Sequence, residues 1–286
     1  GTLTQNEMTA RAVYCHATPK TVFGLTGVGY GTQSGELIIQ DNSSSSSSSK
    51  SSSAPHRISY SSQEWDVIAA LFHTASLCNN ATLSVDGDSE KEHSGQPTEL
   101  ALLVGTIKAG LEDPRPQYHR TQEVPFSSDR KRMEVRARPI GGRHVCRAFA
   151  YCNKSKQSSL LPEDSRRRSS GSNDGSIFYV KGMPESVLGE CTTYTGMDGS
   201  PTSLSEEDKA QVLAQSRRMA AQGGLRVLAM AYGPTLQSLT FAGLIGMEDP
   251  PRVGVADAVT QLQKGGVKVL MVTGDSKETA IAIAKR

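Results

Sequence analysis

The sequence contains neither a long apolar run nor an obvious leader, the features of membrane-spanning and secreted proteins. No stretch approaches the roughly 18 consecutive apolar residues of a membrane-spanning helix. No signal peptide opens the chain either. We therefore interpret the chain as soluble and cytosolic. Because it begins with Gly1–Thr4 and no methionine, we expect it to be a piece of a longer protein.

The chain also lacks paired cysteines, a charge imbalance and a Walker-type phosphate loop. Its five cysteines form no Cys-x-x-Cys pair and have no histidine at zinc spacing, which is typical of reduced thiols in a reducing compartment. The net charge is only +2, from 31 basic and 29 acidic residues, so nothing indicates binding to nucleic acid or to an anionic membrane. No Gly-x4-Gly-Lys-Ser/Thr sequence is present.

Two polar segments interrupt a chain of 286 residues that is long enough for one or two domains. The first is serine-rich and spans residues 41–57, and the second spans residues 153–176. Neither can bury enough apolar surface to offset the entropy of ordering, so we expect both to be mobile. The second lies between the strand-like runs Val145–Tyr151 and Ile177–Val180, which predicts an insertion into a hairpin.

Apolar spacing and capping signals predict the regular elements around these segments. Helices are expected from Trp65 to Ala75, from Leu100 to Ala109, and after a capping box of Ser203 and Glu206 as far as Gly223–Gly224. Strands are expected at Leu225–Ala231, Leu239–Gly246 and Val267–Val272. The middle of the chain thus reads as α+β and its C-terminal part as α/β.

The third strand leads into a turn with phosphate-binding chemistry. Thr273, Gly274 and Asp275 would lie at the start of a helix, where a hydroxyl and backbone amides can hold phosphate oxygens. Asp275 could lie near a magnesium ion, although no complete metal site is recognisable. The alternative is an ordinary turn in which Asp275 caps the helix.

Three further segments carry candidate nucleotide-binding residues, each with a plainer alternative. Phe126 and the nearby Lys131 could stack a base and attract its phosphates, or Phe126 could be a core residue beside solvated charges. Lys181 and Gly182 end a β-rich run, where the lysine could meet a ligand that approaches the glycine backbone, or could simply be solvated. Arg226 could bind phosphate, or could pair with a carboxylate at a strand edge.

The order of four motifs resembles that of the P-type ATPases. Gly1–Thr4 resembles the end of their DKTGTLT signature, and Lys181–Glu185 resembles their KGAPE motif with Met183 in place of alanine. Asp249–Arg252 resembles their DPPR segment, and Thr273–Asp275 their TGD motif. Other segments, such as Thr26–Tyr30, look most like the secretory-pathway (Golgi) calcium/manganese pumps, and Ser128 departs from the arginine typical of the reticulum pumps.

The resemblance implies a two-part architecture. An α+β nucleotide-binding domain, with an antiparallel sheet flanked by helices, would be inserted in an α/β phosphorylation domain of the haloacid dehalogenase type that is only partly present. Residues 1–6 would start the phosphorylation domain, residues 7–236 would form the nucleotide-binding domain with the insertions 41–57 and 153–176, and residues 237–286 would return to the phosphorylation domain.

The resemblance also implies roles for individual residues. Phe126 would stack on adenine, and Glu99 would reach the adenine end of the site. The cations of the cleft would be Lys131, Lys181 and Arg226, with Gly182 beside them. Thr273, Gly274 and Asp275 would meet the transferred phosphate of ATP and its Mg²⁺.

The resemblance finally implies a function and its partners. The nucleophilic aspartate is expected just before Gly1, so this monomeric piece should be inactive alone. In the parent pump it would present the γ-phosphate of ATP to that aspartate, together with the actuator, phosphorylation and transmembrane domains, at the cytosolic face of a Golgi-type membrane. Two alternatives are a soluble phosphatase of the haloacid dehalogenase type, which would not need an adenine site, and a non-catalytic scaffold, which would bind no nucleotide.

Overall fold

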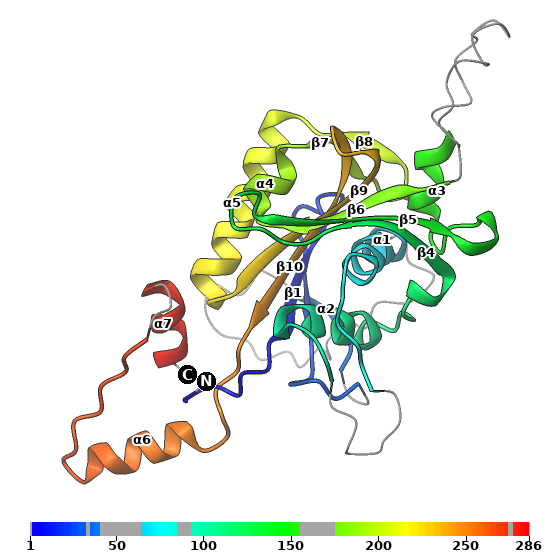
Figure 1. Cartoon of the computed structure of the whole chain (residues 1–286). Helices are drawn as coiled ribbons and strands as arrows, with labels where there is room; N and C mark the ends of the chain where they lie inside the picture. The colour runs from blue at the N-terminus through cyan, green and yellow to red at the C-terminus, as the bar shows by residue number, and fades with distance from the viewer. Residues whose placement is uncertain are drawn as a thin grey trace, which may run out of the picture.

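A computed structural model describes residues 2–32, 35–40, 64–84, 93–154, 175–273 and 277–285. These residues form a ten-stranded sheet with helices on both faces, and a C-terminal segment extends beyond one end of the sheet (Figure 1). Segment 41–57 and nearly all of segment 153–176 lie outside the described residues, so their expected mobility stays a prediction.

The sheet is almost entirely antiparallel. Its order is β3-β2-β1-β10-β9-β6-β5-β4, and β7 pairs with both β10 and β8. Only the β10–β7 pair among the described strands is parallel. The strands are β1 Thr9–Tyr14, β2 Val22–Leu25, β3 Leu37–Gln40, β4 Tyr118–Val124, β5 Arg132–Pro139, β6 Ile177–Gly182, β7 Cys191–Thr195, β8 Pro201–Ser203, β9 Arg226–Thr235 and β10 Ser238–Glu248.

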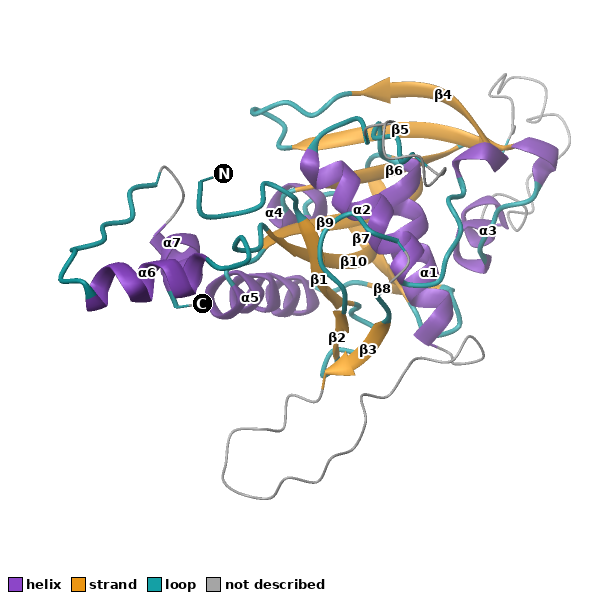
Figure 2. Cartoon of the chain, turned by 90° about the horizontal axis from the view of Figure 1, so that it is seen from below, coloured by secondary structure: helices purple, strands orange, loops and turns teal. Residues whose placement is uncertain are grey.

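Two groups of helices cover the two faces of this sheet, and each buries its own core (Figure 2). The alternation of side chains along a strand separates the cores, because Tyr179 of β6 faces one and Val180 faces the other. Helices α1 Glu64–Leu77, α2 Pro97–Lys108 and α3 Arg147–Lys154 lie on the first face, and α4 Pro184–Leu188 and α5 Glu206–Gly223 on the second. The remaining helices are η1 Arg115–Gln117, η2 Ile140–Gly142, α6 Val255–Lys264 and α7 Lys277–Ala284.

The three helices expected from the sequence are confirmed, with one correction at a cap. Every residue of α1 from Val67 to Leu77 is buried, including the polar His73, Thr74 and Ser76, so the helix is buried on all sides and not only on its apolar face. Helix α5 ends at Gly224, whose φ of 61° suits glycine at a C-cap. Its capping box, however, consists of Ser205 and Asp208 and not of Ser203 and Glu206, because Ser203 still belongs to β8.

The expected strand at Val145–Tyr151 is wrong. The segment enters α3, whose buried Ala148 and Phe149 and half-buried Cys152 recur at helical spacing. Short apolar runs do not distinguish a buried strand from a helix, and here packing against the sheet decides for the helix. Segment 153–176 therefore connects a helix to β6 and does not interrupt a hairpin.

The expected strand at Val267–Val272 is also wrong, whereas those at Leu225–Ala231 and Leu239–Gly246 are confirmed as β9 and β10. Residues 267–273 have no regular structure and are exposed, with Val272 94% exposed. A buried parallel strand needs neighbouring strands and covering helices, and none of the described strands pairs with this segment.

None of the described helices is both long enough and apolar enough to cross a membrane.

Candidate functional site

Three elements bring the predicted nucleotide-binding residues together. They are the loop of residues 125–131 between β4 and β5, the end of β6, and the first turn of α2. The pairing of β5 with β6 places Arg132 opposite Gly182 and Met133 opposite Lys181, so the loop lies beside the end of β6. Glu99 approaches from α2 and contacts Lys181 directly.

Phe126 projects from the 125–131 loop with 58% of its surface exposed. The alternative that it is a core residue is therefore wrong. The loop holds its shape through its own hydrogen bonds: the Lys131 amide donates to the Ser127 carbonyl at 2.7 Å, and the Arg130 guanidinium donates to the Pro125 carbonyl at 2.8 Å. An exposed ring on an ordered loop is available to stack on a flat ligand.

Lys181 and Glu99 form an ion pair that is almost entirely removed from solvent. The Lys181 Nζ lies 2.5 Å from the Glu99 Oε1, and their side chains are only 9% and 11% exposed. Glu99 lies in the first turn of α2, where the helix dipole favours a carboxylate. The alternative that Lys181 is simply solvated is wrong, since burying a charge is tolerated here only because it is paired.

Gly182 is required by a close approach of the neighbouring strand. A methyl group added to it would lie 2.5 Å from the Lys131 carbonyl oxygen and 2.6 Å from the Cβ of Arg132. The next amide, that of Met183, donates to the same Lys131 carbonyl at 2.9 Å. Lys131 itself has a positive φ of 53°, which is uncommon for a residue with a side chain. The contact between β6 and the loop thus fixes the backbone of Lys131.

We expect Gly182→Ala to destabilise the fold by about 1–3 kcal/mol, because the obstructing atoms are mostly backbone and cannot move cheaply. Urea denaturation measures this loss. Gly189→Ala is the matched control, since a methyl group there would lie 3.5 Å from its nearest neighbour, an ordinary contact. Equal stability of the two variants would contradict the role assigned to Gly182.

The cations of the loop and Arg226, which begins β9, differ in how far they are neutralised. Glu134 is buried and accepts from Arg132 Nε at 2.8 Å, while Arg130 lies 3.6 Å from the same oxygen. Arg132 also contacts Glu190 at 3.0 Å. By contrast, Lys131 and Arg226 are exposed, and neither forms an ion pair with a described residue. These two cations are the ones available to an anionic ligand.

Two of the four sequence motifs contact each other just beyond the ends of the neighbouring strands β1 and β10. The Thr4 hydroxyl donates to Asp249 Oδ2 at 2.6 Å, and the Arg252 amide donates to the Leu3 carbonyl at 2.9 Å. The Gln5 amide donates to the Pro250 carbonyl at 2.9 Å. The segments before β1 and after β10 are thus paired, although about 245 residues separate them.

The predicted phosphate site is not brought together with the other residues. Thr273 lies in the exposed segment between α6 and α7, away from the sheet (Figure 1). Gly274 and Asp275 lie outside the described residues. Among the residues that are described, no three His, Cys, Asp or Glu side chains gather as metal ligands.

The five cysteines are all free, as the sequence predicted for reduced thiols. Burial raises the pKa of the Cys78 thiol to about 11 and that of Cys15 to about 12. The thiols of Cys146, Cys152 and Cys191 likewise have pKa values of about 12 because of burial. A thiol that stays protonated at neutral pH is a poor nucleophile.

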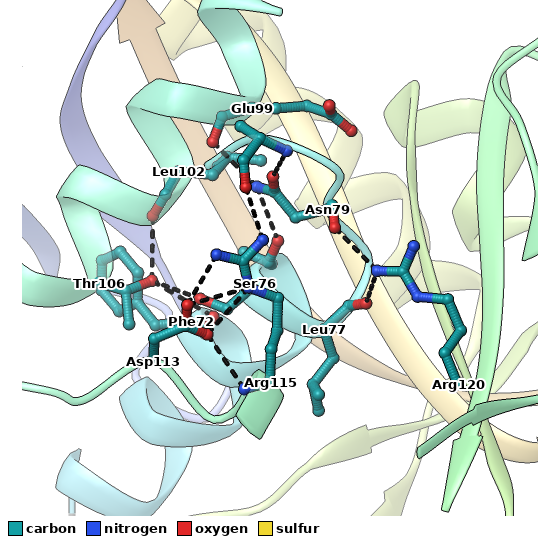
Figure 3. A network of polar contacts seen from close by, with 12 residues as sticks. Phe72, Ser76, Leu77, Asn79, Glu99, Leu102, Thr106, Asp113, Arg115 and Arg120 are labelled. Atoms are coloured by element: carbon teal, nitrogen blue, oxygen red, sulfur yellow. Dashed lines mark hydrogen bonds and ion pairs between the residues drawn. The ribbon is translucent and has the colours of Figure 1, made fainter. Parts of the chain in front are cut away.

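Sequence reasoning missed two polar residues beside the ion pair, Asn79 and Arg120. They belong to a network that joins the end of α1 to α2 and β4 (Figure 3). The position of Asn79 just after an apolar helix was a weak signal of a helix end. Nothing in the sequence pattern connects Arg120 to this turn, because the contact depends on how β4 lies against α1.

Comparison with known proteins places these features in a family. Residues 67–254 match the sequence family described as P-type ATPase, cytoplasmic domain N. The chain is 34% identical over 290 residues to the human calcium-transporting ATPase type 2C member 1, covering 100% of this chain and 25% of that protein. It is likewise 34% identical to the human type 2C member 2, covering 24% of it.

A third relative is calcium-transporting ATPase 1 of Schizosaccharomyces pombe, which is 36% identical over 215 residues, 74% of this chain and 20% of that protein. The chain spans about a quarter of the length of the human relatives. The motif order and the antiparallel sheet flanked by helices agree with these matches. The chain belongs to the P-type ATPases and contains their cytoplasmic domain N.

Proposed function

We propose that this chain binds ATP at the site formed by the 125–131 loop, the end of β6 and the first turn of α2. The observation that carries the proposal is an exposed aromatic ring on an ordered loop that lies beside the end of β6, where Lys181 is buried and paired. Phe126 would stack on the adenine, and the exposed Lys131 and Arg226 would attract the phosphates. Glu99, paired with Lys181, would lie at the adenine end.

The expected affinity is modest. One stacked ring contributes about 1–3 kcal/mol by analogy with nucleic-acid bases. Exposed charges add little each, because water and salt screen them, and the sequence has no phosphate loop. A dissociation constant on the order of 0.1–1 mM is therefore expected.

We expect Phe126→Ala to weaken ATP binding by about 1–3 kcal/mol, which is roughly 5- to 150-fold, while leaving the fold intact. Isothermal titration or NMR titration measures the affinity, and urea denaturation measures the stability. Ile140→Ala is the matched control, because Ile140 is 64% exposed and lies outside the site. Normal ATP binding by a folded Phe126→Ala variant would place the adenine elsewhere, and a wild-type chain that binds no ATP would support the scaffold alternative.

The proposed domain arrangement differs from the sequence-based boundary in one place. The boundary at residue 236 separates β9 from β10, although these two strands are paired along most of their length. We place the end of the nucleotide-binding domain after Glu248, so that residues 7–248 form it. Residues 1–6 and the residues after 248 would then belong to a phosphorylation domain of the haloacid dehalogenase type. The pairing of residues 3–5 with 250–252 supports this, because an inserted domain usually has neighbouring ends.

In the whole pump, the proposed role of this chain is to present the γ-phosphate of ATP to the catalytic aspartate. Thr273, Gly274 and Asp275 would contribute to the phosphate site of the phosphorylation domain. ATP would arrive as its Mg²⁺ complex, and we assign no step to the metal. By similarity to the type 2C ATPases, we propose that the pump transports calcium and that this chain faces the cytosol of a secretory-pathway membrane, in contact with the actuator, phosphorylation and transmembrane domains.

A further inference from the structure

The turn that follows α1 is attached to the first turn of α2 by one buried side chain. Asn79 is only 1% exposed, and its Nδ2 donates to the Glu99 carbonyl at 2.9 Å and to the Ala75 carbonyl at 3.4 Å. Its Oδ1 accepts from the Ala81 amide at 2.9 Å. All the hydrogen-bonding groups of this amide are therefore used, and they fix the backbone of Glu99 relative to α1 (Figure 3).

Arg120 attaches the same turn to β4. Its Nη2 donates to the Asn79 carbonyl at 2.8 Å and to the Leu77 carbonyl at 3.2 Å, which satisfies carbonyls left open at the end of α1. Its Nη1 pairs with Glu123 at 2.8 Å, one residue before β4 ends. Two residues later β4 has given way to the loop that carries Phe126. One network thus reaches both the Glu99–Lys181 pair and the strand that leads to Phe126.

We propose that Asn79 and Arg120 are positioning residues of the nucleotide site. Asn79 holds the backbone of Glu99 so that its carboxylate stays against Lys181. Arg120 holds the turn after α1 against β4, the strand that leads to Phe126. The ATP-binding consequence of this inference rests on the proposed function. The effect on the Glu99–Lys181 pair does not, because the pair forms without nucleotide.

A second contact between the same two helices offers a matched control. The Ser76 hydroxyl lies 2.9 Å from the Thr106 hydroxyl, and both residues are buried. Thr106 is seven residues after Glu99, or about two turns further along α2. Ser76→Ala removes a buried polar contact from α1 to α2, and Asn79→Ala removes one from the turn after α1 to α2, but only Asn79→Ala removes a contact that holds Glu99.

The test uses two readouts on the 286-residue chain. The first is the ¹H–¹⁵N signal of the Lys181 ammonium group, which should be visible in the wild type because the group is held in a buried ion pair. The second is ATP affinity, measured under conditions in which every variant is fully folded. In Asn79→Ala we expect the Lys181 signal to shift or broaden and the affinity for ATP to fall about five- to tenfold, the effect of one lost hydrogen bond. Ser76→Ala should change neither.

Each outcome decides the inference. An unchanged Lys181 signal in Asn79→Ala, or equal changes in Asn79→Ala and Ser76→Ala, would overturn it. If Asn79→Ala does not fold, Arg120→Gln replaces it, because the Arg120 side chain is 32% exposed and its loss is better tolerated; it should produce the same two changes. If the wild type binds no ATP, the proposed function fails, and the Lys181 signal alone still decides whether Asn79 positions the pair.

Discussion

Replacing Lys181 with methionine should lower the free energy of unfolding by about 3–5 kcal/mol at pH 7. The loss follows from burial: the substitution leaves the Glu99 carboxylate in a place where only 11% of its side chain reaches solvent, without the cation that compensates it. Methionine has a similar length to lysine, so packing is largely kept. Urea denaturation of the wild type and the variant measures the difference.

The double variant Glu99→Gln, Lys181→Met separates the charge effect from the packing effect. Removing both charges should recover most of the stability lost in Lys181→Met, since no unpaired ion is then buried. A Lys181→Met variant that loses less than about 1 kcal/mol, or a double variant that is no more stable than Lys181→Met, would show that the pair is not energetically coupled.

A second large loss of stability is expected when Phe149 is truncated. Phe149 lies in α3, where the sequence predicted a strand. Its ring is fully buried and lies 5.1 Å from the ring of Tyr179 and 4.8 Å from that of Tyr232, measured between centroids. Truncation to alanine removes these contacts and leaves a cavity between the helix and the sheet. We expect Phe149→Ala to cost about 3–5 kcal/mol in thermal or urea unfolding.

Arg147 provides the comparison on the same helix. Its side chain is 64% exposed and lies 3.6 Å from Asp66, a surface pair that contributes little. Arg147→Ala should therefore change stability by less than about 0.5 kcal/mol. A small loss for Phe149→Ala, similar to that of Arg147→Ala, would mean that α3 does not pack on the sheet as described.

The sequence was most informative where a local pattern decides the structure. The apolar spacing of α1 and α2 predicted helices, and the strands at β9 and β10 were also recognised. The sequence was misleading where tertiary contacts decide which element forms. The apolar run at Val145–Tyr151 suits either a strand or a helix, and only the docking of Phe149 against Tyr179 and Tyr232 settles which forms.

The candidate site was predicted as a set of residues but not as a geometry. Glu99 and Lys181 are 82 positions apart, and their contact depends on the register of β5, β6 and β9 and on the docking of α2. No spacing rule in a single sequence contains that information. The same holds for Asn79 and Arg120, whose importance follows from backbone carbonyls that the sequence does not display.

Chemical-shift mapping during an ATP titration of the ¹⁵N-labelled chain shows whether ATP binds at the proposed site of Phe126, Lys131, Lys181 and Glu99. We expect shifts at these four residues that saturate with a dissociation constant on the order of 0.1–1 mM. The signals of residues in the core between α5 and the opposite face of the sheet, such as Val212 of α5, should not shift. Shifts confined to that opposite face, or no shifts at millimolar ATP, would contradict ATP binding at this site.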